Sequence, residues 1–154
     1  MPLNPPPGVQ QITTRITYAD PPAAIEFLGR AFGFIERRSK RLVGQGSAII
    51  VAEIAIGDMY VMIGRAGSHG LMSPQETGAP TASLMVYVDD VDDHYQRATA
   101  AGAVIVSEPT DQYWGDRRYE ARDIEGHAWF FHQHIRDVPQ HEIDAFEARF
   151  KRPD

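Results

Sequence analysis

Residues 20–33 read DPPAAIEFLGRAFG, and this stretch contains the signals expected of one complete helix. The side chain of Asp20 can accept hydrogen bonds from the first free backbone amides, and proline in the first turn loses no hydrogen bond. Apolar residues then recur with helical spacing, at Ile25, Leu28 and Phe32. Gly33 follows as the stop, because glycine readily adopts the left-handed conformation that ends many helices. The sequence therefore predicts a helix between Asp20 and Gly33.

The same order of signals returns at residues 90–102, which read DVDDHYQRATAAG. Asp90 takes the place of the cap and Gly102 that of the stop. The apolar positions between them are Val91, Tyr95 and Ala98. The distance from cap to stop is 13 residues in the first segment and 12 in the second. We therefore predict a second helix that repeats the first, with His94 on its exposed side.

Strand-like sequence precedes and follows each predicted helix. The preceding strands are predicted at residues 12–18 and 83–88, where apolar and polar residues alternate. The following strands turn at Gly57 and at Gly126, each 24 residues after the stop glycine of its helix. Three landmarks in one order at near-equal spacing indicate two βαβββ modules. The predicted fold class is α+β, with the modules forming a curved mixed sheet around a cleft.

The predicted organisation has five parts, which differ in composition. They are a disordered, proline-rich lead-in (1–9), the first module (10–64), a linker rich in Gly, Ser and Pro (65–80), the second module (81–135), and a C-terminal helix and tail (136–154). Within the last part we expect an amphipathic helix over residues 139–150, with Ile143, Phe146 and Phe150 on one face.

Composition narrows the classes of function. The 154 residues fit one globular domain, with 43% hydrophobic and 23% charged residues. The absence of cysteine excludes disulfides, thiolate catalysis and cysteine-bound zinc. A net charge of −6 without an extended basic cluster argues against a nucleic-acid partner. The sequence also has no apolar run long enough for a membrane span and no secretory signal, so we expect a cytoplasmic protein without a membrane partner.

Strand alternation separates two faces of each predicted sheet. The helix-facing sets are Ile12, Ile16 and Tyr18 in the first module and Leu84, Val86 and Val88 in the second. The opposite sets are Thr13, Arg15 and Thr17 in the first module and Ser83, Met85 and Tyr87 in the second. Phe130, on the last strand, joins this mixed polar and aromatic face. A solvated face rarely carries such side chains, so we predict a concave ligand-binding surface, with a dimer interface or a second packing layer as alternatives.

The segment Trp114-Gly115-Asp116-Arg117 is the other candidate for ligand contact. Trp114 could stack on a planar ligand while Arg117 or Arg118 fixes a carboxylate or phosphate. Alternatively, Trp114 fills the core and a turn at Asp116 and Arg117 caps the strand. The complete set of predicted ligand contacts is Thr13, Arg15, Tyr60, Ser83, Met85, Tyr87, Trp114, Arg117 and Phe130. The acidic chain favours a cationic ligand, whereas Arg15 and Arg117 favour an anionic group.

The chain resembles the vicinal-oxygen-chelate superfamily, which includes glyoxalase I, extradiol dioxygenases and bleomycin-binding proteins. The residues that carry the resemblance are 17–20, 24–28, 31–34, 86–91, 115–119 and 123–129. The pattern covers residues 10–135 and is most similar to the PhnB-like or bleomycin-resistance-like branch. This superfold hosts several chemistries, so the resemblance implies the fold more strongly than an activity.

Metal enzymes of this superfamily hold their ion with two His and two Glu side chains. The resemblance places these four ligands at Thr13, Ser83, Val61 and Phe130, none of which carries an imidazole or a carboxylate. The residues one position to either side do not supply one either. A divalent ion needs three or four such donors, so we predict no metal and no cofactor. His132 and His134 share one side of a strand, but we expect a surface or hydrogen-bonding role for both.

The resemblance implies a homodimer that binds a small molecule. We expect a metal-free protein that sequesters an aromatic or amphipathic ligand, as drug-binding resistance proteins do. One alternative is a lyase, isomerase or dioxygenase with a non-standard metal site or with acid–base chemistry at His132 or Glu120. Another is a module that serves only as a protein-interaction surface. The sequence assigns no catalytic residue.

Overall fold

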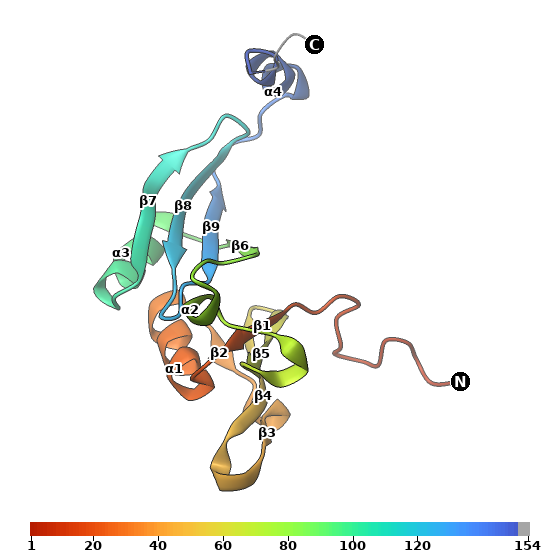
Figure 1. Cartoon of the computed structure of the whole chain (residues 1–154). Coiled ribbons are helices and arrows are strands. Elements are labelled where there is room, and N and C mark those ends of the chain that lie inside the picture. The colour runs from red at the N-terminus through yellow and green to blue at the C-terminus, as the bar shows by residue number, and fades with distance from the viewer. Residues whose placement is uncertain (151–154) are drawn as a thin grey trace.

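The computed structural model describes residues 1–150, in which two modules of similar build follow one another (Figure 1). The first contains β1 (Arg15–Tyr18), α1 (Pro21–Phe32), β2 (Ile35–Glu36), β3 (Leu42–Val43), β4 (Ile49–Ile56) and β5 (Met59–Arg65). The second contains β6 (Ser83–Tyr87), α3 (Val91–Ala100), β7 (Val104–Asp111), β8 (Asp116–Arg122) and β9 (Ala128–His134). A short helix, α2 (Pro74–Thr77), lies in the linker, and α4 (Gln140–Glu147) follows the second module.

Each module forms its own mixed sheet. The strand order is β1-β5-β4-β2 in the first, with β3 on β4, and β6-β9-β8-β7 in the second. The leading strand is parallel to the last strand in both modules, and all other pairs are antiparallel. This correspondence confirms the predicted α+β class and the repeated βαβββ unit.

The predicted helix signals act as expected. The Asp20 carboxylate accepts a hydrogen bond from the backbone N–H of Ala23 at 3.2 Å, and Asp90 does the same for Asp93 at 2.9 Å. Gly33 ends α1 with φ of 76°, in the left-handed region. In the second module the helix ends at Ala100, two residues before Gly102.

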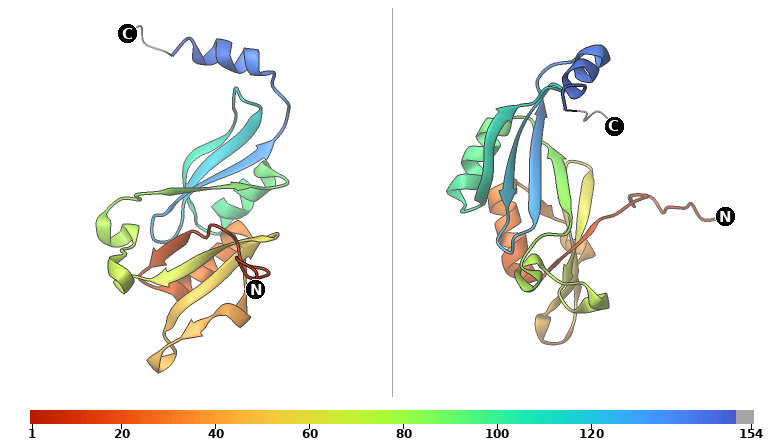
Figure 2. Two further views of the ribbon diagram at one scale, coloured as in Figure 1. Left: turned by 90° about the vertical axis from the view of Figure 1, so that its right-hand side faces the viewer. Right: turned by 45° about the horizontal axis from the view of Figure 1, so that its top comes forward.

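The first strand is shorter than predicted. It begins at Arg15, and Ile12 is 84% exposed instead of packing on the helix side. The side-chain amide of Gln10 explains the difference, because it donates to the carbonyl of Tyr60 at 3.0 Å and accepts from its N–H at 2.6 Å. A side chain therefore occupies backbone groups of β5 that a longer β1 could have paired. Residues 1–14 contain no helix or strand, and the chain before Gln10 extends away from the body of the protein (Figure 2).

The C-terminal helix is also shorter than residues 139–150, and residues 151–154 of the predicted tail lie outside the described residues. It lies beyond the tips of β7 and β8 (Figure 2). Its contact with the second module is aromatic: the rings of Tyr113 and Phe146 stack with centroids 4.2 Å apart. Among residues 1–150 no helix is both long and apolar enough to cross a bilayer.

The core lies where α1 and α3 pack together, and its largest buried side chains are aromatic. Phe32 contacts Trp129 and Phe131, with ring centroids 5.6 and 4.7 Å apart. His94 belongs to this core and is only 5% exposed, so the prediction that it faces solvent is wrong. The face of α3 that packs on α1 is wider than the predicted apolar stripe and includes this imidazole. The ring reaches two partners, the Tyr119 hydroxyl at 2.6 Å and the Phe32 carbonyl at 3.1 Å.

Because a carbonyl can only accept, Nε2 of His94 must donate to Phe32, and Nδ1 then accepts from the Tyr119 hydroxyl. This arrangement needs the neutral imidazole. Burial lowers the pKa of His94 to about 4, so the ring stays uncharged at neutral pH.

Stability should therefore fall on acidification. Between pH 6.5 and about 4 the unfolded chain binds a proton at His94 that the folded chain does not bind. The free energy of unfolding should decrease through this window by up to about 3 kcal/mol. Urea denaturation at several pH values measures it, and His94→Gln should remove this part of the dependence. His141→Gln, at an exposed position of α4, is the control and should leave it intact. An equal dependence in wild type and His94→Gln would contradict the assignment.

Candidate functional site

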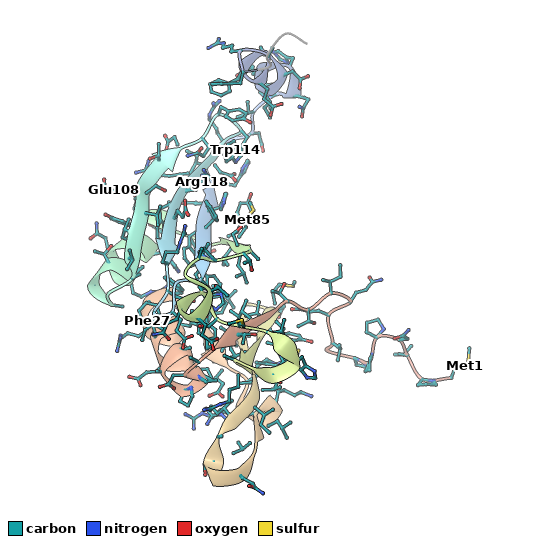
Figure 3. All side chains as sticks on the ribbon, viewed as in Figure 1. Met1, Phe27, Met85, Glu108, Trp114 and Arg118 are labelled. Carbon is teal, nitrogen blue, oxygen red and sulfur yellow. The ribbon has the colours of Figure 1, made fainter. Side chains whose placement is uncertain are left out.

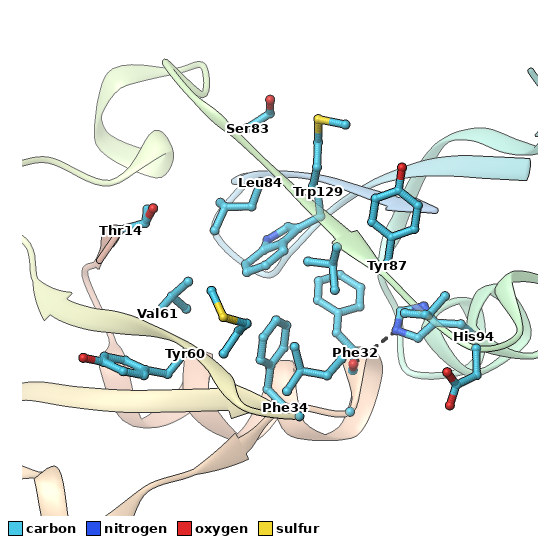
Figure 4. A pocket seen from close by; sticks show the side chains of 18 of the residues that line it. Thr14, Phe32, Phe34, Tyr60, Val61, Ser83, Leu84, Tyr87, His94 and Trp129 are labelled. Atoms are coloured by element: carbon cyan, nitrogen blue, oxygen red, sulfur yellow. Dashed lines mark hydrogen bonds between the residues drawn. The ribbon is translucent and has the colours of Figure 1, made fainter. Parts of the chain in front are cut away.

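A cleft of about 1170 Å³ lies between the two modules. Figure 4 shows Leu84 and Trp129 of the second module facing Val61 and Phe34 of the first across this space. The apolar and aromatic side chains that line it are Ile12, Phe32, Phe34, Ile56, Met59, Tyr60, Val61, Leu84, Met85, Val86, Tyr87, Val88 and Trp129. Aromatic rings form part of the wall, and those of Phe34 and Trp129 lie 5.3 Å apart. The cleft is therefore large and mainly apolar.

The position of β6 in its sheet explains why this space is open. This strand pairs with β9 on one side only, so it forms an edge of the second sheet. Its helix-facing side chains, Leu84, Val86 and Val88, are half-buried because the other module does not close over them. The sequence indicated that these residues face the core, and a complete layer would have covered them. Here they form one wall of the cleft.

One end of the cleft is polar and acidic. It is lined by Asp89, Asp90 and Asp93, which surround the start of α3, and by Arg97. His94 adds no charge there at neutral pH, because burial lowers its pKa. This end therefore has three carboxylates and one guanidinium.

A second cavity, of about 170 Å³, lies beside β1 under the linker. It is lined by Arg15 and Thr17 from β1, by His127, and by Leu71, Met72 and Pro74 from the linker, among others. Thr14, Ser83 and Leu84 line both this cavity and the large cleft. The two spaces are therefore neighbours at the start of β6.

A polar network covers the open face of the second sheet. The buried carboxylate of Asp116 accepts hydrogen bonds from the Tyr87 hydroxyl at 2.7 Å, His132 Nδ1 at 3.1 Å and His134 Nδ1 at 2.9 Å. Burial opposes ionisation of Asp116, but hydrogen bonds from His134, Tyr87, Trp114 and His132 outweigh it and hold its pKa at about 2. His132 is 1% exposed, and its Nε2 atom has no partner among the described residues.

The predicted ligand contacts divide between these surfaces. Tyr60, Ser83, Met85 and Tyr87 line the cleft, and Arg15 lines the small cavity. Thr13 lies beside the cleft wall, with its hydroxyl 3.5 Å from that of Tyr60. The remaining three, Trp114, Arg117 and Phe130, line neither cavity.

Trp114, at the end of the second sheet, was expected to stack on a ligand or to fill the core, but its ring contacts an arginine. Of the two candidate arginines, Arg118 lies over the Trp114 ring at 5.5 Å and over the Phe130 ring at 5.1 Å. Figure 3 labels Arg118 and Trp114 at this end of the sheet. Arg117 is bound by Asp92 at 3.0 Å and by Asp111 at 2.7 Å. The alternative of a capping turn is wrong, because Asp116 and Arg117 are the first residues of β8.

The positions aligned with metal ligands need one correction. Arg15 of β1 stands opposite Met62, as Met85 of β6 stands opposite Phe130. Met62 and not Val61 is therefore the structural equivalent of Phe130, and it lies five residues after Gly57, whereas Phe130 lies four residues after Gly126. Met62 has no oxygen or imidazole donor either. Within residues 1–150 no three His, Asp or Glu side chains are grouped to hold a metal ion.

Comparison with known proteins agrees with this architecture. Residues 9–131 match the family described as the Glyoxalase/Bleomycin resistance protein/Dioxygenase superfamily. The chain therefore belongs to this superfamily. It is 32% identical to an uncharacterized protein of Mycobacterium bovis over 139 residues, which is 87% of this chain and 90% of that protein.

Two solved structures share the fold. TioX from Micromonospora sp. ML1 is 34% identical, with a TM-score of 0.63 over 82% of this chain and 100% of that one. A glyoxalase/bleomycin resistance protein/dioxygenase family enzyme from Burkholderia phytofirmans PsJN is 22% identical, with a TM-score of 0.65 over 80% of this chain and 97% of that one. The second likeness concerns the fold alone.

The Asp116 network predicts an altered titration of His134. Hydrogen bonds to Asp116 and then to Asp137 raise the pKa of this half-exposed imidazole. Asp116→Asn removes the buried negative charge, so the His134 pKa should move down toward its ordinary value. NMR titration of the ring protons measures the shift. Asp137→Asn is the matched control and should lower the pKa less, and a larger effect there than in Asp116→Asn would contradict the network.

Proposed function

We propose that this protein is a metal-free small-molecule-binding protein of the PhnB-like or bleomycin-resistance-like type. In this proposal it sequesters an aromatic or amphipathic ligand in the cleft between its modules. The observation that carries the proposal is the mainly apolar cleft of about 1170 Å³. Pockets that bind drug-sized molecules have volumes of roughly 300–1000 Å³, so the cleft is large enough for a ligand of this size. The cysteine-free composition fits the reducing cytoplasm as its compartment.

Apolar burial would supply the affinity. Leu84, Val86 and Val88 are half-exposed in the ligand-free chain, and removing such surface from water contributes about 25 cal/mol per Å². The Tyr87 ring lines the cleft and is 60% exposed, so it offers an aromatic surface for a planar ligand, since offset aromatic contacts add about 0.5–1.5 kcal/mol each. Trp129 and Phe34 are 0% and 6% exposed and support the wall from behind. A ligand of this kind needs no metal ion, and Thr13, Ser83, Met62 and Phe130 supply no ligand set for one.

The Asp116–His132 pair supports a second candidate, acid–base catalysis without a metal. A histidine oriented by a carboxylate, with its other nitrogen free, is a common general base. His132 fits this description, with Nδ1 on Asp116 and Nε2 unpartnered within the described residues. We favour sequestration because His132 does not line the cleft. Glu120, the other candidate, is held by Arg122 at 2.6 Å.

Filling the cleft should abolish binding. A thermal-shift screen with aromatic antibiotics and metabolites identifies binders, and calorimetric titration of each one gives its affinity. Val86→Trp places an indole in the cleft and should weaken binding at least about tenfold, which corresponds to about 1.4 kcal/mol. Val106→Trp, on β7 and outside the cleft, is the matched control and should bind normally.

Two further measurements test whether binding needs a metal and whether the ligand is changed. A chelator should leave the affinity unchanged, and a loss that added metal restores would refute the metal-free proposal. Mass spectrometry of the ligand after incubation separates sequestration from catalysis. An unchanged ligand supports sequestration, whereas a new product that disappears in His132→Gln supports the acid–base candidate.

We also propose that the protein is a homodimer joined through β1 and β6. Each strand is an unpaired edge of its sheet, and its pairing with the neighbouring strand has no register shift. The opposite edge of the second sheet, β7, has two register shifts, and edge strands of this kind resist pairing. On β6, Met85 and Tyr87 are 64% and 60% exposed. A second copy would pair the free backbone groups and close the cleft on this side, so that these side chains lie both at the interface and in the cleft.

Light scattering during gel filtration should therefore give twice the mass of the chain. Met85→Asp puts a charge into the proposed interface and should raise the dissociation constant at least about tenfold. Val104→Asp, equally exposed on the irregular edge β7, should leave the mass unchanged. A monomeric wild type, or equal effects of the two variants, would refute this interface.

A further inference from the structure

Arg15 has no carboxylate within ion-pair distance, and among the arginines of the described residues only its side chain has a buried nitrogen without a hydrogen-bond partner. Six arginines of residues 1–150 form ion pairs: Arg30, Arg37, Arg38, Arg41, Arg117 and Arg122. The guanidinium of Arg15 makes one hydrogen bond, from Nη2 to the Ser68 hydroxyl at 3.4 Å. Its Nε atom is buried and has no partner among the described residues. A partly buried guanidinium left in this state retains most of its capacity to bind an anion.

Gly64 makes room for this guanidinium. The two residues lie on adjacent strands, β1 and β5, and a methyl group at Gly64 would lie only 2.7 Å from Nη2 of Arg15. The side chain therefore lies directly against the glycine. Any residue larger than glycine would displace the guanidinium.

The small cavity gives Arg15 access to a ligand group. Its volume of about 170 Å³ suits one functional group and not a whole ligand. Hydroxyl-bearing residues line it together with Arg15, namely Thr14, Thr17, Thr77, Thr81 and Ser83. Thr14, Ser83 and Leu84 also line the large cleft, so the two spaces adjoin each other at these residues.

The charges of the two ends give the ligand a direction. The far end of the cleft has Asp89, Asp90 and Asp93 against Arg97 alone, which is unfavourable for an anion. The near end has Arg15 without a carboxylate. Of the other arginines expected to bind an anion, Arg117 is already neutralised by Asp92 and Asp111, and Arg118 lies over the Trp114 and Phe130 rings and lines neither cavity.

We infer that the ligand is an aromatic anion, whose apolar body occupies the cleft and whose acidic group binds Arg15 in the small cavity. This inference rests on the proposed binding function and specifies its ligand class. The guanidinium donates to the acidic group, which takes the place of the missing carboxylate partner. Arg15 is thus the residue that selects anions, while the apolar wall supplies affinity without regard to charge.

Two fluorescent probes with the same aromatic body test it. 8-Anilinonaphthalene-1-sulfonate has a sulfonate, and N-phenyl-1-naphthylamine is its uncharged counterpart. Wild type should bind the sulfonate more tightly by about tenfold, as one charge-assisted contact of about 1.5 kcal/mol implies. Arg15→Met keeps the length of the side chain and should remove this preference, leaving the neutral probe bound within about twofold of wild type.

Two variants control for side effects. Gly64→Ala keeps Arg15 but displaces its guanidinium, so it should weaken the sulfonate and spare the neutral probe. Arg30→Gln removes an exposed charge on α1 that lines neither cavity, and it should change neither affinity. Thermal melting checks that each variant folds, which we expect because Arg15 has no ion pair to lose.

The outcomes separate the two proposals. Loss of the sulfonate preference in Arg15→Met and Gly64→Ala, with Arg30→Gln unaffected, supports the anion site. Binding of both probes without a preference, or a preference that survives in Arg15→Met, overturns the anion site and leaves the cleft as a binding site. Failure of wild type to bind either probe counts against the proposed binding function itself.

Discussion

The buried carboxylate of Asp123 joins the two modules. It lies in the loop between β8 and β9 and accepts hydrogen bonds from the Tyr18 hydroxyl at 2.6 Å and from the Trp129 indole at 2.9 Å, besides two backbone amides of its own loop. Two residues on, Glu125 accepts from the backbone of Ala19 and Asp20 at 2.7 and 2.8 Å. Hydrogen bonds to charged groups are worth about 1.5–3 kcal/mol each, so these contacts strongly favour one relative placement of the modules. Burial and Asp123 raise the pKa of Tyr18 well above its ordinary value, so its hydroxyl stays protonated and can donate to the carboxylate.

The cleft follows from that placement. The loop containing Asp123 binds the end of β1 and the start of α1, and α1 packs on α3 around Phe32. These contacts close one side of the space between the modules. On the other side β6 is an edge strand, and its aliphatic face remains half-buried. The same open edge thus produces both an apolar wall for a ligand and a surface on which a second copy can pair.

The charged side chains on the open sheet faces fall into two groups, those with a partner in the chain and those without one. Six of the twelve arginines in residues 1–150 form ion pairs with carboxylates, and the Asp116 carboxylate accepts hydrogen bonds from Tyr87, His132 and His134. A buried charge without a partner is costly, so an unpaired group marks a position where the chain alone does not complete the interactions. Arg15 is such a position, and it lies where the small cavity meets the cleft.

The repeat spacing was sufficient to predict the fold. Capping aspartates, stop glycines and strand alternation are local signals, and they correctly placed both helices and the two faces of β6 and β9. The limits of β1 and the burial of His94 were missed, because they depend on Gln10, Tyr119 and Phe32, which are distant in sequence from the groups they bind. The candidate site was predicted in part, at Tyr60, Ser83, Met85, Tyr87 and Arg15. Its apolar wall was not, because alternation shows which side chains share a face but cannot show whether another layer covers that face. That depends on how the two modules dock, and the docking rests on contacts that span more than 100 residues of chain, such as Tyr18 with Asp123.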